Sequence, residues 1–107
     1  MDIKQKRTPI IEALKKFAEK SPIYYCIPSH HQGRGASETF TDVFGKSMLK
    51  YDLTETPLTD DLHEAEGPIK EAEELAAQLF GADRTFFLVN GPTCANEAMI
   101  TASVSEG

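Results

Sequence analysis

The chain has 107 residues, of which 40% are hydrophobic, and its formal net charge at pH 7 is −6. This length fits at most one domain, and no apolar run approaches the ~20 residues that span a membrane. The charged start, Met1–Arg7, is not followed by an apolar stretch, so we predict no secretory signal. Cys26 and Cys94 lie far apart without a zinc-binding spacing, which favours free thiols in the cytoplasm, although two cysteines can also form one bridge.

The acidic residues are concentrated in one part of the chain. Residues 52–74 contain nine Asp or Glu and one basic residue, Lys70, whereas residues 1–51 carry nine Lys or Arg against five acids. An acidic belt disfavours nucleic acid as a partner, because phosphate contacts supply most of that affinity. The belt suits a cationic ligand or a basic surface, and a solvated loop and helix face is the simpler alternative.

Two segments have the pattern of amphipathic helices. The first begins at Thr8–Pro9, an N-cap followed by a proline at the first helical position, and ends before Ser21–Pro22. The second begins at Gly67–Pro68 and ends at Phe80–Gly81, where the glycine suits the position just after a helix. Each helix needs a partner for its apolar face.

The segments between these helices are predicted to be mostly irregular. Residues 23–27 predict a short extended segment, and residues 40–49 predict one or two weak helical turns. Residues 52–67 lack periodicity, which indicates an irregular but ordered loop. Within this loop, Asp60 and Asp61 are of the type that caps backbone N–H groups, although the loop charge also suits the cation of a basic ligand.

The last part of the chain predicts a strand, a tight turn and a helix. Residues 85–89 are apolar and partly β-branched or aromatic, as expected of a central strand covered on both faces. Gly91 supplies the turn, and Thr93 caps a helix from about Cys94 to Val104. Such a turn points N–H groups and a hydroxyl at one spot, as in phosphate sites. From the turn alone, an ordinary strand–turn–helix is the simpler interpretation.

This order of elements predicts an α/β fold, helix–loop–helix–strand–helix, that is incomplete. A lone apolar strand cannot satisfy its own backbone groups, and the helix after it should return the chain to a parallel neighbour. The sequence stops at Gly107, where that neighbour should begin. We therefore expect a fragment or truncated gene product, or a chain that completes its sheet with another chain.

Three sequence blocks, taken together, indicate a known family. They are Arg7–Thr8–Pro9 with Glu12–Ala13–Leu14, then Asp52–Leu53–Thr54–Glu55 with Asp60–Asp61–Leu62–His63, and then Gly67–Pro68–Ile69 running through Phe80–Gly81–Ala82 to Asn90–Gly91. These blocks resemble the N-terminal part of the pyridoxal-phosphate-dependent Orn/Lys/Arg decarboxylases. They follow one another at the distances found in that family, and together they cover nearly the whole chain. The resemblance implies the start of the large domain of a fold-type-I enzyme, with residues 1–66 as an N-terminal arm and acidic loop and residues 67–107 as the beginning of the cofactor-binding domain.

The resemblance implies that the turn after residues 85–89 holds the phosphate of pyridoxal 5′-phosphate. By position, Gly91 supplies the tight turn, Thr93 supplies a hydroxyl and an amide, and Cys94 supplies an amide. Pro92 departs from the family pattern because it has neither a hydroxyl nor an N–H. Each missing charge-assisted bond costs about 1.5–3 kcal/mol of cofactor binding, so the chain alone is expected to bind the cofactor poorly.

The segment 28–35 is similar to a family stretch near the active-site mouth and the subunit interface. The resemblance implies a substrate or interface role for His30 and Arg34, and for Glu55 in the acidic loop. A solvated histidine pair without function is an equal alternative. No metal site is expected, because adjacent side chains such as His30 and His31 rarely converge on one ion.

The residues that carry the family's chemistry do not occur in this sequence. The Schiff-base lysine, the acid at the pyridine nitrogen and the stacked histidine lie later in family members, and no Ser-x-His-Lys occurs here. The resemblance implies an N-terminal fragment of a Lys, Arg or Orn decarboxylase that is inactive alone and pairs with the remainder of the enzyme or a homologous subunit. The alternative is a non-catalytic protein that dimerises with a full-length decarboxylase and modulates it. Pro92 disfavours a third possibility, a stand-alone phosphate-binding module.

Overall fold

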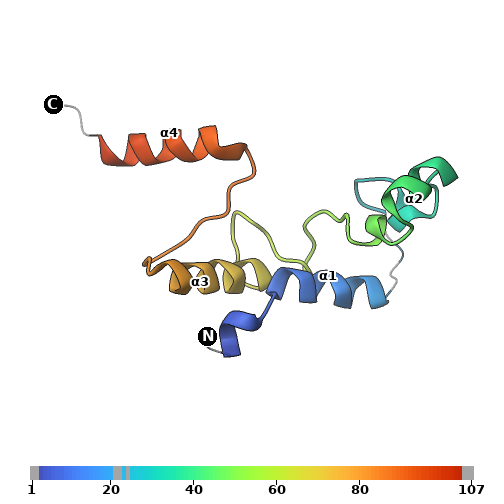
Figure 1. Ribbon diagram of the computed structural model, residues 1–107, viewed down its shortest axis with the longest axis horizontal. Coiled ribbons are helices and arrows are strands. Elements are labelled where there is room, and N and C mark those ends of the chain that lie inside the picture. Colours follow the sequence, from blue (N-terminus) through green and yellow to red (C-terminus); the bar gives the residue numbers. More distant parts are fainter. Residues whose placement is uncertain (1–2, 21–22, 24, 105–107) are drawn as a thin grey trace.

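The computed structural model describes residues 3–20, 23 and 25–104. The regular elements within these residues are helices, irregular segments connect them, and an isolated antiparallel bridge joins Thr56 and Asp60. The α-helices are α1 (Pro9–Lys20), α2 (Glu38–Phe44), α3 (Pro68–Phe80) and α4 (Gly91–Ser103), and the 3-10 turns are η1 (Ile3–Lys6), η2 (His31–Gly33) and η3 (Met48–Lys50) (Figure 1).

Both predicted amphipathic helices, α1 and α3, form where the sequence places them. α3 has a proline in its first turn and ends at Gly81, which adopts the left-handed conformation with φ 66°. The Ala82 N–H then donates to the Ala77 C=O at 2.9 Å and closes the last turn. The bounds of these helices therefore follow from local signals in the sequence.

The middle of the chain also follows the sequence prediction in part. The weak helical turns over residues 40–49 are confirmed as the end of α2, which Gly45 terminates, followed by η3. The extended segment predicted over residues 23–27 does not form a strand. Ile23 and Tyr25 belong to no regular element, and residues 26–27 form a bend. Residue 24 lies outside the described part of the chain.

The strand predicted over residues 85–89 is not formed, so the α/β class is not seen in the described residues. A strand exists through hydrogen bonds to a neighbouring strand, and here Glu73 provides a different acceptor. Its Oε1 accepts the Phe87 N–H at 3.0 Å. Thr85 and Phe87 are half-buried while Phe86 and Leu88 are exposed, so burial alternates as it would along a strand.

The last helix begins earlier than predicted. α4 starts at Gly91 with Asn90 as its N-cap, so Thr93 is its third residue and not its cap. The cause is Pro92, because its fixed φ and its missing N–H are accommodated without cost in the first turn of a helix. The predicted capping role of Thr93 is therefore wrong.

The helices form an open arrangement. α1 packs against α3, η1 contacts α3, and η2 contacts η3, whereas α4 lies apart from the α1–α3 pair (Figure 1). The buried apolar side chains among the described residues are Pro9, Phe17, Leu49 and Ala77. The radius of gyration is 17.5 Å, compared with about 13 Å for a compact domain of this length. Much apolar surface therefore stays exposed.

Asp60 fixes the acidic loop to the start of α3. Its Oδ2 accepts the N–H groups of Gly67 at 2.8 Å and Ile69 at 2.9 Å. Its Oδ1 accepts the N–H groups of Asp61 and Glu66, each at 3.0 Å. The capping role predicted for Asp60 is therefore confirmed.

These bonds change the acidity of Asp60. Partial burial raises the pKa of its carboxyl, but the backbone N–H groups that bond to it lower the pKa by more, to about 2. The carboxylate is thus charged at the positive end of α3, where it complements the helix dipole.

Replacing Asp60 with alanine is expected to lower the free energy of unfolding by about 1–2 kcal/mol. The loop and the first turn of α3 lose their shared acceptor, and alanine is strained at the φ of 80° that Asp60 adopts. Urea unfolding followed by far-UV circular dichroism measures the loss. Asp83→Ala is the control, because Asp83 is an exposed aspartate in the turn after α3. Equal stability of the two variants would contradict the prediction.

The contribution of Asp60 to stability is also expected to depend on pH. Its carboxyl has a pKa of about 2 in the folded chain against an ordinary value of 3.8. A group with a lowered folded pKa stabilises the fold above its unfolded pKa, so this contribution is complete above about pH 4 and is lost as the pH falls toward 2. The difference in unfolding free energy between the wild type and Asp60→Asn should shrink over this window. A constant difference would show that Asp60 is not the titrating group.

Candidate functional site

The predicted phosphate site lies at the start of α4. Gly91 has a φ of 75°, which glycine adopts readily, and a Cβ at this position would meet no heavy atom within 4 Å. The N-cap Asn90 makes no side-chain hydrogen bond to the helix. Thr93 is exposed and Cys94 is half-buried. The site is therefore an open helix N-terminus with a hydroxyl residue in its first turn.

Pro92 reduces the number of N–H donors at this end of α4. The first four N–H groups of a helix, counted from the N-cap, lack intrahelical partners, and Pro92 contributes none. The N–H of Thr93, the third residue, belongs to this set. Cys94 is the fourth residue, whose N–H a regular helix bonds to the Asn90 C=O. Thr93 is therefore the better-placed donor of the two, and phosphate binding here stays a prediction.

The start of α3 shows how another helix that begins with a Gly–Pro pair is capped by the protein itself. Gly67 is the N-cap of α3 and Pro68 its first residue, whereas Gly91 and Pro92 are the first two residues of α4. At α3 the carboxylate of Asp60 accepts the first N–H groups. At α4 the N-cap side chain makes no such bond. One Gly–Pro helix start thus binds an internal anion, and the other is open to an external one.

His30 and Arg34 are the N-cap and the C-cap of η2. The segment that contains η2 lies away from α4 (Figure 1). His30 Nε2 is 3.2 Å from Asp52 Oδ2, and His30 Nδ1 is buried without a hydrogen-bond partner in the described residues. Arg34 is exposed, and its backbone N–H donates to the His31 C=O at 3.3 Å. The structure gives His30 a carboxylate partner, and the substrate or interface roles of His30 and Arg34 stay predictions.

Glu55 and Asp61 act locally as caps within the acidic loop. Glu55 Oε1 accepts the Leu62 N–H at 2.7 Å, and Asp61 Oδ1 accepts the His63 N–H at 2.8 Å. These carboxylates satisfy backbone donors of an irregular segment, which is the common use of such residues. The substrate or interface role of Glu55 stays a prediction.

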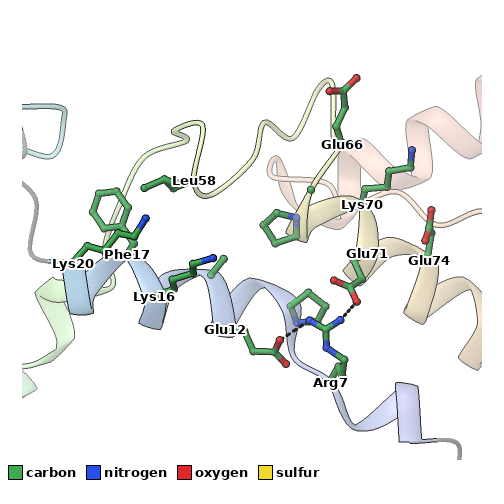
Figure 2. A pocket seen from close by; sticks show the side chains of 14 residues that line it. Arg7, Glu12, Lys16, Phe17, Lys20, Leu58, Glu66, Lys70, Glu71 and Glu74 are labelled. Atoms are coloured by element: carbon green, nitrogen blue, oxygen red, sulfur yellow. Dashed lines mark hydrogen bonds and ion pairs between the residues drawn. The ribbon is translucent and has the colours of Figure 1, made fainter.

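A groove of about 630 Å³ lies between α1 and α3 (Figure 2). Arg7 lies at one end and donates to the carboxylates of both Glu12 and Glu71; its bond to Glu12 is 2.6 Å long. The hydrogen bond between Arg7 and Glu12 raises the pKa of the guanidinium and lowers the pKa of the carboxyl. The three charged groups thus join the N-terminus of α1 to α3.

The other end of the groove carries two lysines. Lys16 and Lys20 are one helical turn apart on α1, and they lie beside Phe17 with Leu58 nearby (Figure 2). Sequence reasoning missed both this groove and the Arg7 contacts. Arg7 and Glu71 are 64 residues apart, and no local pattern brings such distant positions together.

No group of three or more His, Cys, Asp or Glu side chains among the described residues could hold a metal ion. No helix in that part of the chain has the length and apolar character needed to cross a membrane. Cys26 and Cys94 are free thiols.

The chain belongs to the Orn/Lys/Arg decarboxylase family, because residues 8–107 match the major domain of that family. It is 41% identical over 103 residues to the arginine decarboxylase of Bacillus subtilis (strain 168), covering 96% of this chain and 21% of that protein. It is 32% identical over 105 residues to the inducible ornithine decarboxylase of Lactobacillus sp. (strain 30a), covering 92% of this chain and 14% of that protein. No solved structure matches the chain significantly.

The family predicted from the three sequence blocks is therefore confirmed. The chain corresponds to the N-terminal region of these proteins. It spans about a fifth of the length of the arginine decarboxylases that it matches.

Proposed function

We propose that this chain is the N-terminal part of a pyridoxal-phosphate-dependent decarboxylase of a basic amino acid, and that it is inactive by itself. The match of residues 8–107 to the family's major domain carries the proposal. The sequence contains no Ser-x-His-Lys, the pattern that holds the cofactor lysine in this family. The chain therefore contributes to the fold and to the cofactor phosphate site, and the remainder of the enzyme contributes the chemistry.

The two parts of the chain have different places in the complete enzyme that we propose. Residues 1–66 form the N-terminal arm and the acidic loop, and residues 67–107 begin the cofactor-binding domain. Within that domain we expect residues 85–89 to become a strand, because a neighbouring strand then supplies the hydrogen bonds that they lack here. The alternation of burial over residues 85–88 supports this expectation.

Pyridoxal 5′-phosphate would supply the electron sink for the loss of CO₂ in the complete enzyme. The groups in this chain that would hold its phosphate are the N–H groups of Gly91 and Thr93 and the hydroxyl of Thr93. The positive end of the α4 dipole favours the phosphate charge. The open N-terminus of α4 supports this assignment.

L-Arginine is the substrate that we propose first. Four relatives with 38–41% identity are named arginine decarboxylase, while relatives with 30–32% identity are named ornithine or lysine decarboxylase. We also propose a cytoplasmic location, since the two free thiols favour a reducing compartment.

Complementation tests the proposal. The test uses the Bacillus subtilis arginine decarboxylase shortened by the region that this chain matches. The shortened enzyme alone is expected to be inactive. Once this chain is added, the mixture is expected to release CO₂ from L-arginine. The added chain restores the cofactor phosphate site and the missing part of the sheet. Complete Bacillus subtilis enzyme mixed with the chain is the control. A change in the activity of the complete enzyme, with no rescue of the shortened one, would instead support a non-catalytic modulator.

Pro92→Ser is expected to tighten cofactor binding, because serine adds an N–H and a hydroxyl to the first turn of α4. The apparent dissociation constant for pyridoxal phosphate should fall at least about tenfold in the complemented enzyme. Absorbance titration measures it. Pro68→Ser is the matched control, since Asp60 already caps the Gly–Pro start of α3. An equal effect of both substitutions, or no effect of Pro92→Ser, would contradict the assignment of the phosphate to α4.

A further inference from the structure

The turn η2 has a backbone conformation that residues with a side chain rarely adopt. His31 and Gln32 have φ values of 47° and 58°, and Gly33 follows with a φ of 87°. Positive φ is ordinary for glycine but uncommon for residues with a Cβ. Such strain persists only where surrounding contacts hold it, and it concentrates at switches and ligand clamps. Contacts outside the backbone of η2 therefore have to offset the strain.

One such contact joins the start of η2 to the residues after η3. His30, the N-cap of η2, has its Nε2 3.2 Å from Oδ2 of Asp52. The His30 side chain is 17% exposed, whereas the Asp52 side chain is 57% exposed. A carboxylate only accepts hydrogen bonds, so Nε2 carries the proton. In the neutral ring Nδ1 is then an acceptor.

Two buried polar atoms of this turn lack a partner, and they are complementary. His30 Nδ1 and Gln32 Nε2 are both buried, and neither makes a hydrogen bond to any residue that the structure describes. The first is an acceptor in the tautomer that Asp52 sets, and the second is an amide donor. Buried polar atoms are almost always paired, directly or through an ordered water. The leftover donor and the leftover acceptor of one turn therefore indicate a bond between them.

The turn is also held closely against η3. A Cβ at Gly33 would lie 3.3 Å from the Cβ of Leu49, and Leu49 is buried. The Gly33 N–H donates to the His30 C=O at 2.8 Å. The closed turn thus keeps the Gly33 Cα beside the Leu49 side chain, and this proximity reports whether η2 is closed.

We propose that Asp52, His30 and Gln32 form a hydrogen-bond relay that latches the strained turn η2 onto η3. The Gln32 amide donates to His30 Nδ1, directly or through one water, and His30 Nε2–H donates to Asp52. When the relay is broken, the strain at His31 and Gln32 opens the turn. The inference goes beyond the decarboxylase proposal, since this conformational switch lies within residues 30–52 and needs neither the cofactor nor the rest of the enzyme.

Nitrogen-15 NMR of the histidine rings of the purified chain tests the relay. At about pH 8 an ordinary histidine ring is neutral. The His30 ring should then carry its proton on Nε2 alone, whereas the exposed His63 should show both tautomers. Gln32→Glu places an acceptor where the relay has a donor, so His30 Nδ1 should gain a proton. A protonated Nδ1 in the wild type, or an unprotonated Nδ1 in Gln32→Glu, would overturn the relay.

The nuclear Overhauser effect between the Gly33 Hα and Leu49 methyl protons tests the latch. Asp52→Ala removes the acceptor of Nε2–H, so the turn should open and this signal should be lost. Adding His31→Gly relieves the left-handed strain and should restore the signal. Adding Ser29→Gly is the matched control, because it introduces a glycine beside the turn where φ is not positive. An unchanged signal in Asp52→Ala, or equal signals in the two double variants, would contradict the proposal.

Discussion

The hydrogen bonds between the Asp60 carboxylate and backbone N–H groups are the interaction that anchors the acidic loop to α3. It ties the acidic loop to the first turn of α3 through backbone N–H groups on both sides of the turn. α3 in turn contacts η1, the start of α1 and the segment 85–89. Its Glu71 binds Arg7 before α1, its Leu75 C=O accepts the Gln5 side chain, and its Glu73 holds the segment 85–89.

The two Gly–Pro helix starts connect this architecture to function. Both present N–H groups at the positive end of a helix, and such an end attracts an anion. At α3 the anion is a side chain of the same molecule, so this start is used for stability. At α4 the N-cap side chain leaves the helix end open, and in a decarboxylase of this family a cofactor phosphate would take the place that Asp60 takes at α3.

Residues 85–89 are the part of the chain whose proposed state in the complete enzyme differs most from the described structure. The residues have the composition of a buried strand, but a strand forms only with a neighbour, and α3 offers a single carboxylate. The remainder of a decarboxylase would supply the missing acceptors and donors. α4 follows this segment and lies apart from the α1–α3 pair (Figure 1).

The sequence by itself determined the bounds of α1 and α3, because capping residues, prolines and apolar periodicity act within a few residues of each other. It also determined the family, through blocks spread along the chain, and the capping role of Asp60, which bonds to N–H groups seven and nine residues away within the same loop and helix start. It also contained the signal for the start of α4, namely Pro92, which our prediction from Thr93 did not use. Only the tertiary structure decided the state of residues 85–89 and the groove beside Arg7. Both depend on groups far apart in the chain, such as Arg7 and Glu71, 64 residues apart, and local patterns carry no information about such distant partners.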